Sequence, residues 1–361
     1  MSGGTWMIYG ANGYTGELVA REAVRRGERP ILAGRNAAAV EALAAELELP
    51  ARVFPLTDPG SLRANLVDVA AVLHCAGPFV HTSRPLVDGC LASGTHYLDI
   101  TGEIAVFESI LARGAKAVRA GVALLPGVGF DVVPTDCLAA RLAAALPGAT
   151  HLELAFHGEG GGVSRGTLKT MIEGLPHAGA ERRDGRIVPL PAVYDAKEIE
   201  FSCGPRWAMT VAWGDVSTAF HTTGIPNIRV YTGAPPAAIR RMRRLRPLLP
   251  LAGLGPVKAL LRAWADHRDP GPDAEARVSG RVYFWGRVTD AVGASVAATL
   301  ETPEGYAFTA ASAVECTLRL LAGGVEPGAW TPARAFGADL VTELPGVVVG
   351  ELVRSDVTQP G

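Results

Sequence analysis

Short apolar runs alternate with amphipathic segments over the first third of the chain. Apolar runs of strand length that precede residues at helical spacing predict strands alternating with helices. Six expected strands, each with its tip, lie at 6–9, 29–36, 52–56, 69–79, 96–103 and 122–131. This regular order predicts a Rossmann-type α/β fold, a doubly wound parallel sheet whose ligands bind beyond the carboxyl ends of the strands.

The pattern changes after residue 135. Alternating runs at 151–156, 208–213, 228–232, 277–289 and 293–301 predict strands, and 136–146, 168–173 and 308–321 read as helices. A helix is also expected over 331–343, a strand over 347–352, and a loop-rich lid over 176–206, which proline punctuates. We therefore expect a second, α+β domain on a mixed or antiparallel sheet. The predicted parts are a nucleotide-binding domain (1–135), a substrate domain (136–325) and a tail (326–361) that packs back near the inter-domain region.

Three glycines spaced three apart follow the first strand. The motif comprises Gly10, Ala11, Asn12, Gly13, Tyr14, Thr15 and Gly16. A sharp turn, a close backbone approach to a pyrophosphate and tight helix packing each need a glycine, and the following helix offers its N-terminal amides to phosphate. The motif predicts a dinucleotide site; a tight turn without a ligand is the alternative.

The tip of the second strand carries no acid. NAD-preferring sites place Asp or Glu there, whereas this chain has Arg35 and Asn36. A guanidinium at this position suits a 2′-phosphate, so we predict NADP(H) as the cofactor; a solvated arginine is the alternative. Asp58, after the third strand, either borders the adenine or caps the next helix.

Three further strand tips are expected to converge on one crevice. Small residues at the exit of the fourth strand leave room for the nicotinamide half of the cofactor, and the fifth strand ends in a polar tip. The predicted cofactor-binding residues here are Ala76, Gly77, Pro78, Thr101 and Gly102, with Phe79 facing the substrate. The sixth strand leads to Asp131.

A second glycine-rich turn lies at residues 160–167. It ends in Ser164, Arg165, Gly166 and Thr167 and opens a helix, which makes it a candidate anion or carbonyl site. Ser164, Arg165 and Thr167 are predicted to line the substrate cleft; the alternative is a capping turn.

Five motifs occur in an order that resembles the saccharopine dehydrogenase-like oxidoreductases, most closely the trans-acting enoyl reductases of bacterial polyketide and lipid assembly. They are Gly-Ala-Asn-Gly-Tyr-Thr-Gly (10–16), Ala-Gly-Arg (33–35), Cys-Ala-Gly-Pro-Phe (75–79), Tyr-Leu-Asp-Ile-Thr-Gly-Glu (97–103) and Pro-Gly-Val-Gly-Phe-Asp-Val-Val-Pro-Thr-Asp (126–136). The likeness covers about residues 5 to 170. It implies a nicotinamide cofactor in the first domain and a substrate domain after the sixth strand.

The expected activity is an NADPH-dependent reduction of an activated C=C bond, with an enoyl thioester as substrate. An imine or amino-acid oxidoreductase is the alternative within the family, and a non-catalytic lipid- or membrane-associated protein the alternative outside it. Hydride addition to an enoyl thioester requires a proton at the α-carbon. Tyr97, Asp131 and Ser164 are the candidates for catalytic residues, and none is assigned as the proton donor.

Composition and charge indicate which binding partners and which cellular compartment to expect. The net charge of −2 gives no reason to expect nucleic acid, and the five cysteines show no metal spacing and suit a reducing cytoplasm. We expect no metal, and a monomer or homodimer. Arginines at 240–246 precede an apolar, proline-broken stretch, so residues 240–264 are a candidate contact for an acyl carrier protein or a membrane surface; a solvated helix is the alternative.

Overall fold

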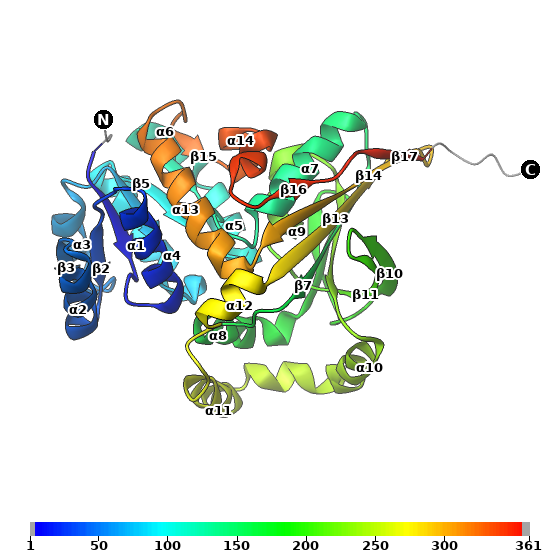
Figure 1. Cartoon of the computed structure of the whole chain (residues 1–361), viewed down its shortest axis with the longest axis horizontal. Helices are drawn as coiled ribbons and strands as arrows, with labels where there is room; N and C mark the ends of the chain where they lie inside the picture. The colour runs from blue at the N-terminus through cyan, green and yellow to red at the C-terminus, as the bar shows by residue number, and fades with distance from the viewer. Residues whose placement is uncertain (1–3, 356–361) are drawn as a thin grey trace, which may run out of the picture. The chain divides into compact units, whose positions relative to one another are not determined.

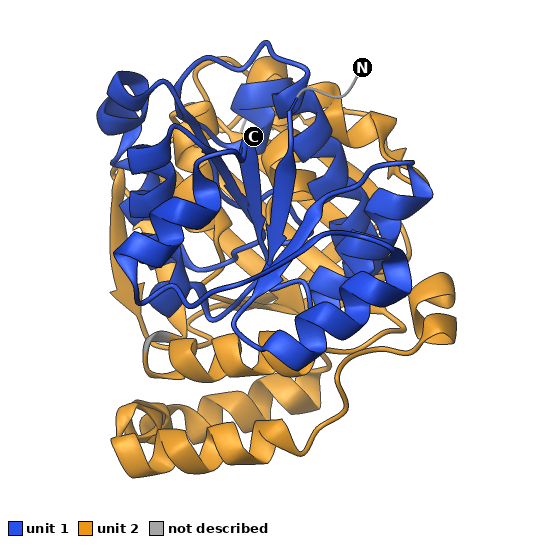
Figure 2. Cartoon of the chain, turned by 90° about the vertical axis from the view of Figure 1, so that its left-hand side faces the viewer, with its two compact units in different colours: residues 1–131, 306–336 blue, residues 132–305, 337–361 orange. Residues whose placement is uncertain are grey.

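The computed structural model describes residues 4–355, which form two compact units (Figures 1 and 2). The first unit comprises residues 1–131 and 306–336, and the second residues 132–305 and 337–361. Among the described residues, no helix is both long and apolar enough to cross a membrane.

The first unit is built on a parallel sheet of seven strands in the order β15-β6-β5-β4-β1-β2-β3. The strands are β1 (Trp6–Tyr9), β2 (Ile31–Gly34), β3 (Ala51–Val53), β4 (Ala71–His74), β5 (His96–Asp99), β6 (Ala123–Leu125) and β15 (Gly328–Ala329). The helices are α1 (Tyr14–Arg25), α2 (Ala37–Leu47), α3 (Pro59–Leu66), α4 (Phe79–Ser93), α5 (Ile104–Leu111), α6 (Gly114–Ala120), α13 (Gly305–Leu321) and α14 (Pro332–Phe336). The reversal of strand order at β1 and β4 confirms the Rossmann-type prediction.

The core strands of this sheet are apolar on both faces because helices cover both. Every residue of β1, β2 and β4 is buried. Continuous apolar runs are typical of parallel strands, whereas strands that face water on one side alternate. The pattern that predicted these strands therefore also predicted their burial.

The second unit has a mixed sheet in the order β10-β11-β12-β7-β13-β14-β16, confirming the α+β prediction. Its strands are β7 (His151–Glu159), β8 (Gly179–Arg183), β9 (Arg186–Leu190), β10 (Ala196–Phe201), β11 (Gly204–Thr210), β12 (Asn227–Gly233), β13 (Arg281–Thr289), β14 (Ser295–Pro303), β16 (Val348–Val349) and β17 (Val353–Ser355). Its helices are α7 (Val133–Ala145), α8 (Arg165–Gly174), η1 (Leu175–His177), α9 (Asp215–Thr223), α10 (Pro236–Leu245), η2 (Arg246–Gly253), α11 (Gly255–Asp266), α12 (Ala274–Ser279) and η3 (Ala338–Glu343).

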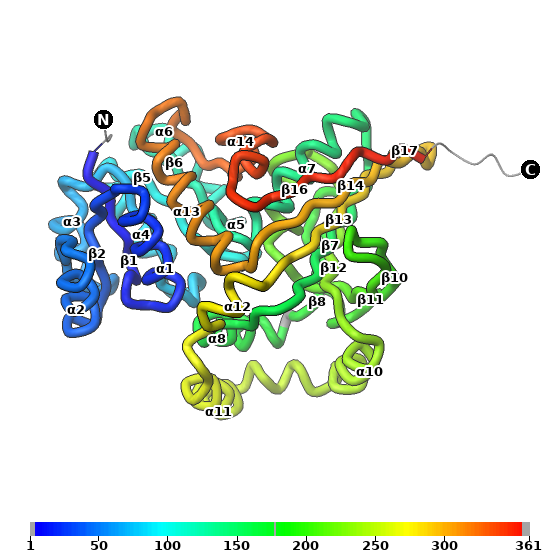
Figure 3. Tube along the Cα trace, viewed as in Figure 1, coloured from blue at the N-terminus to red at the C-terminus, as the bar shows by residue number. Residues whose placement is uncertain are grey.

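The predicted boundaries at 135/136 and 325/326 differ from these units. The predicted second domain includes α13, yet from Tyr306 onward this helix belongs to the first unit, where Glu315 pairs with Arg26, directly after α1, at 2.7 Å. β15 then adds to the parallel sheet beside β6, with Gly328 opposite Ala123. Figure 3 follows this return of the chain to its N-terminal part. The predicted single tail over 326–361 is wrong for the same reason, because β15 joins the first sheet and β16 the second.

The predicted loop over 176–206 is also wrong. It contains the hairpin β8–β9, all of β10 and the start of β11. Pro189 lies in β9, which pairs only with β8, so the proline removes no hydrogen bond from a central strand. The hydrophobic pattern of the sequence did not predict the helices α5, α6 and α9. The expected helix over 331–343 is divided into α14 and η3.

Candidate functional site

The glycine turn after β1 has the geometry that a dinucleotide site requires. Gly10 has φ +88°, and a Cβ on it would lie 2.7 Å from the backbone nitrogen of Ala76. A Cβ on Gly16 would lie 2.2 Å from the carbonyl oxygen of Gly10, so α1 packs tightly beneath the turn. A Cβ on Gly13 would meet only that carbonyl, at 3.3 Å. The first and third glycines therefore serve the protein's own packing, and Gly13 leaves its outer side open.

The N-terminus of α1 faces this open side. Asn12 and Gly13 are exposed, and no side chain caps the helix at Gly13. Helix N-termini attract phosphate through their backbone N–H groups and the helix dipole. Tyr14 packs edge-on against Tyr306 of α13, with ring centroids 5.0 Å apart. Ala11 is fully buried and its N–H donates to the carbonyl of Ala33, so neither its side chain nor its N–H is available to a phosphate. These residues fit a bound pyrophosphate.

The tip of β2 has an exposed arginine and no carboxylate. Arg35 follows Gly34 directly and is exposed. Asn36 is the N-cap of α2 and accepts from the N–H of Ala39 at 3.3 Å. Asp58 caps α3 in the same way, accepting from Gly60 at 3.0 Å. The structure thus gives the alternative predicted for Asp58, a helix cap, and leaves Arg35 as the cation available to a 2′-phosphate.

Glu103 organises the exit of β4. Its carboxylate accepts from the backbone N–H groups of Phe79 at 2.7 Å and Val80 at 3.0 Å, so it caps α4 from a distant segment. Gly77 is exposed and Ala76 half-buried, as expected of residues that border a cofactor. Phe79 is only 7% exposed, and its ring packs edge-on against His74. The prediction that Phe79 faces the substrate is therefore not supported, because the ring belongs to the core.

A buried polar network lies beneath the site. His74, Tyr97 and Asp99 are all fully buried. The hydroxyl of Tyr97 donates to Oδ2 of Asp99 at 2.8 Å and lies 3.0 Å from Nδ1 of His74. Since the single hydroxyl proton points to Asp99, we assign the proton of the neutral imidazole to Nδ1. Tyr97 has no surface for a substrate and so is a structural residue.

Asp99 is the hub of this network. Its Oδ1 accepts from the backbone N–H groups of Thr101 at 3.1 Å and Gly127 at 2.9 Å, which joins the tip of β5 to the loop after β6. Burial raises the pKa of Asp99 to about 6, although these hydrogen bonds oppose the shift. Burial likewise lowers the pKa of His74 to about 3, so its imidazole is neutral.

Asp131, in the loop after β6, has a carboxyl group whose pKa is near neutrality. Burial raises its pKa to about 7, and the neighbouring Glu103 adds to the shift. Its carboxyl group lies against the backbone at Gly102, where an added Cβ would come within 2.4 Å of Oδ2. Thr101 is buried, and its hydroxyl accepts from the N–H of Glu103 at 3.1 Å. Gly102 and Glu103 at the tip of β5 therefore lie beside Asp131 from the loop after β6.

α13 holds the loop that carries Asp131. The N–H of Phe130 donates to Oγ1 of Thr309 at 3.1 Å, and Oγ of Ser312 donates to the carbonyl of Val128 at 2.9 Å. A Cβ on Gly129 would lie 3.1 Å from Thr309, so loop and helix are in close contact. The sequence reasoning missed this support, because nothing local in residues 306–312 indicates that they return to the first unit.

The predicted substrate turn is occupied by local contacts. Ser164 is 2% exposed and caps α8 by accepting from the N–H of Thr167 at 3.1 Å, and the two hydroxyls also lie 3.1 Å apart. The guanidinium of Arg165 donates to the carbonyl of Arg268 at 2.7 Å. The capping turn, the alternative for this segment, accounts for all three side chains. Ser164 is accordingly not supported as a catalytic residue.

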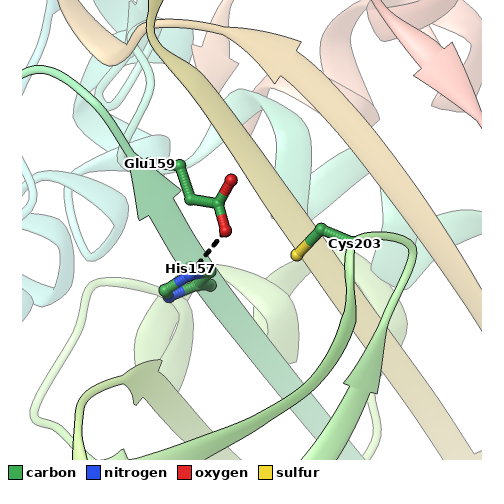
Figure 4. A group of neighbouring side chains, drawn as sticks. All are labelled: His157, Glu159 and Cys203. Carbon is green, nitrogen blue, oxygen red and sulfur yellow. Dashed lines mark ion pairs between the residues drawn. The ribbon is translucent and has the colours of Figure 1, made fainter.

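Another group of ionisable side chains lies on the mixed sheet (Figure 4). Within the part of the chain that is described, His157, Glu159 and Cys203 are the one group of at least three potential metal ligands, with ligand atoms within 4.8 Å of one another. Nε2 of His157 lies 3.5 Å from Oε1 of Glu159, and Arg206 donates to the same oxygen at 2.9 Å. Because the guanidinium already balances the carboxylate, we assign no ion to this group.

A cavity of about 440 Å³ lies on the same unit. The sequence analysis did not identify its charged residues, which come from four strands far apart in the chain. Glu181 pairs with Arg183 and Arg229, and Glu153 pairs with Lys197 and Arg287. Both carboxylates that line the cavity are therefore paired with cations, and the guanidinium of Arg182 in the same lining donates to the carbonyls of Val216 and Gly185.

Residues 6–125 match the saccharopine dehydrogenase NADP binding domain. In this part the chain is similar to the saccharopine dehydrogenase-like oxidoreductases. Its cofactor is NADP(H), in agreement with the glycine turn and the exposed Arg35.

Two curated relatives and one solved structure extend this finding. A proposed trans-acting enoyl reductase of Mycobacterium tuberculosis is 29% identical over 95% of this chain and 96% of its own length. A trans-acting enoyl reductase of Mycobacterium bovis is 32% identical over 36% of this chain and 33% of its own length. Apo saccharopine dehydrogenase (L-Glu forming) from Saccharomyces cerevisiae matches 98% of this chain and 100% of its own, with a TM-score of 0.64 and 14% identity, which shows a shared fold.

Arg35→Ala tests the cofactor preference of this oxidoreductase. A charge-assisted contact to phosphate contributes about 1.5–3 kcal/mol, so the Kd for NADPH should rise by about 10- to 100-fold while the Kd for NADH changes little. Nucleotide fluorescence titrations measure both constants. Arg63→Ala, an exposed arginine on α3, is the matched control. Equal weakening of NADPH and NADH would contradict recognition of the 2′-phosphate by Arg35.

Proposed function

We propose that the chain is an NADPH-dependent reductase of an activated carbon–carbon double bond, and that its substrate is an enoyl thioester. The observation that carries this proposal is the position of Asp131, whose carboxyl group lies against Gly102 beside the carboxyl ends of β5 and β6. Ligands of doubly wound sheets bind at this edge. The names of the relatives, trans-acting enoyl reductases, support the same chemistry.

The reaction needs one proton donor. Bound NADPH supplies the hydride that reduces the β-carbon, and the enolate that results must be protonated at the α-carbon. A carboxyl group donates efficiently when its pKa is close to the working pH. Asp131 meets this condition, because burial raises its pKa to about 7. We assign Asp131 as the proton donor; Gly102 leaves space for its carboxyl group, and the charge of Glu103 helps to raise its pKa.

Reduction of imines has less support from this chain. An amino-acid-like substrate requires cationic side chains that hold its carboxylates. Arg165, the cationic residue of the predicted substrate turn, donates instead from its guanidinium to the carbonyl of Arg268.

Substrate screening tests the proposal. The full chain is incubated with NADPH and either 2-enoyl thioesters of N-acetylcysteamine or a 2-oxo acid paired with an amine. We expect NADPH to be consumed only with the thioesters, one molecule per saturated thioester detected by mass spectrometry. Consumption with the oxo acid and amine alone, yielding a secondary amine, would overturn the proposal in favour of imine reduction.

A further inference from the structure

One strongly basic part of the second unit has no role in the site described above. α10, η2 and α11 follow one another at the edge of that unit (Figure 1), and residues 236–268 are called the basic helical segment here. It contains eight Lys and Arg residues and a single Asp, a net charge of +7. Since the whole chain carries −2, the remainder carries −9. So uneven a distribution is typical of a surface that binds an anionic partner.

The inner side of the segment is already packed. Ile239, Ala252 and Ala265 are buried, and Ile239 forms a small core with Ala192 and Val193 of the same unit. Lys258 and Arg262 of α11 both pair with Glu173 of α8. The segment is thus fixed on its unit without the residues that point outward.

Other apolar side chains of the basic helical segment are exposed to solvent. Leu245, Leu248, Leu251 and Leu254 are 40%, 57%, 50% and 53% exposed. In a 3₁₀ helix, residues three apart lie in line, so Leu248 and Leu251 of η2 form one ridge, with Leu245 directly before η2 and Leu254 directly after it at the same spacing. Leu260 and Trp264, four apart on α11, are 71% and 51% exposed. Five of the six large exposed leucines among the described residues therefore lie in this one segment.

Arginines flank the ridge. Arg240, Arg241, Arg244 and Arg246 are all exposed. Arg243 differs, because its guanidinium donates to the carbonyl of Val193 at 3.3 Å. The segment's single carboxylate, Asp266, pairs with Lys169 of α8 at 2.5 Å. Lys169 thus neutralises the one carboxylate of the segment. The exposed arginines near the leucines are therefore available to an anionic partner.

We propose that the basic helical segment docks the protein on the surface of an anionic lipid bilayer. Segments that lie in a membrane interface combine Lys and Arg with Leu and Trp facing the acyl chains. The leucine ridge and Trp264 provide the apolar contact, and the arginines provide the attraction to acidic headgroups. An acidic carrier protein also complements the charge. A bilayer accounts in addition for the number of exposed apolar side chains, because Leu260 and Trp264 of α11 are exposed as well as the leucines in and beside η2.

Vesicle binding tests this surface. The full chain is mixed with vesicles of phosphatidylcholine alone or of equal parts phosphatidylcholine and phosphatidylglycerol, and the bound fraction is measured by sedimentation. We expect binding to the anionic vesicles that weakens as salt is raised. Arg240→Gln with Arg241→Gln should lower the partition constant about thirty-fold, since each basic residue near an anionic surface contributes about 1 kcal/mol. Leu248→Gln with Leu251→Gln should lower it about tenfold or more.

Matched controls use exposed residues of the first unit. Arg63→Gln with Arg119→Gln removes the same charge, and Val67→Gln with Val118→Gln removes comparable exposed apolar groups; both should bind like the wild type. Circular dichroism checks that every variant is folded. Failure of the wild type to bind anionic vesicles, or equal loss in the control pairs, would overturn the proposal. So would retention of the chain by an acidic acyl carrier protein alone, with no partition into vesicles.

Discussion

Asp131→Asn is expected to lower kcat for an enoyl thioester by about 10²- to 10⁴-fold, the range for loss of a general acid. The amide has nearly the shape of the carboxyl group but cannot deliver a proton to the α-carbon. The Kd for NADPH, measured by fluorescence titration, should stay within about twofold of the wild type, because the glycine turn and Arg35 are unchanged. A variant with wild-type kcat would refute the assignment of Asp131 as the donor.

The pH profile gives an independent check. The acid acts in its protonated form, so kcat of the wild type should be high below the pKa of Asp131 and fall as pH rises through about 7. Asp131→Asn should no longer show this fall of kcat with rising pH, which is called the basic limb of the profile. Glu103→Gln removes the neighbouring negative charge that helps to raise the pKa of Asp131, so the limb should move to lower pH. A limb that stays in place in both variants would show that another group controls the profile.

Asp99→Leu is expected to destabilise the protein by about 4 kcal/mol or more. The substitution leaves the N–H groups of Thr101 and Gly127 and the hydroxyl of Tyr97 without their acceptor, at a cost of about 1–3 kcal/mol for each buried donor. Asp99→Asn is the matched control, because its carbonyl oxygen can still accept from both amides. Denaturant unfolding measures the difference, and equal stability of the two variants would contradict the role of Asp99 as a hub.

Comparison of the wild type with Asp99→Asn also tests a pH dependence of the free energy of unfolding. Burial raises the pKa of Asp99 from 3.8 to about 6, so the folded state binds this proton more tightly than the unfolded state. The stabilisation is fully present below pH 3.8 and is lost as pH rises through about 6, a change of roughly 3 kcal/mol. The wild type should therefore lose stability relative to Asp99→Asn over this interval. A constant difference between the two would contradict the raised pKa.

Much of the first unit could be predicted because its signals are local. The apolar runs of β1, β2 and β4 specify buried parallel strands, and the spacing of Gly10, Gly13 and Gly16 specifies a turn whose geometry only glycine allows. The absence of an acid beside Arg35 likewise needs no tertiary information. The NADP(H) site could therefore be predicted from the sequence.

The tertiary structure decided the features that depend on contacts between distant segments. α13 and β15 join the first unit through pairings with Arg26 and β6, which no local pattern reveals. The sequence presents Ser164 and Phe79 as site residues, but their hydrogen bonds and burial make one a helix cap and the other a core side chain.

Asp131 shows the division most clearly. Its carboxyl group can serve as an acid near neutral pH because Gly102 leaves it space, Glu103 repels its charge and α13 holds its loop. The sequence determined that an aspartate follows the sixth strand. Only the fold, through burial and the neighbouring charge of Glu103 between β5 and α5, decided its pKa.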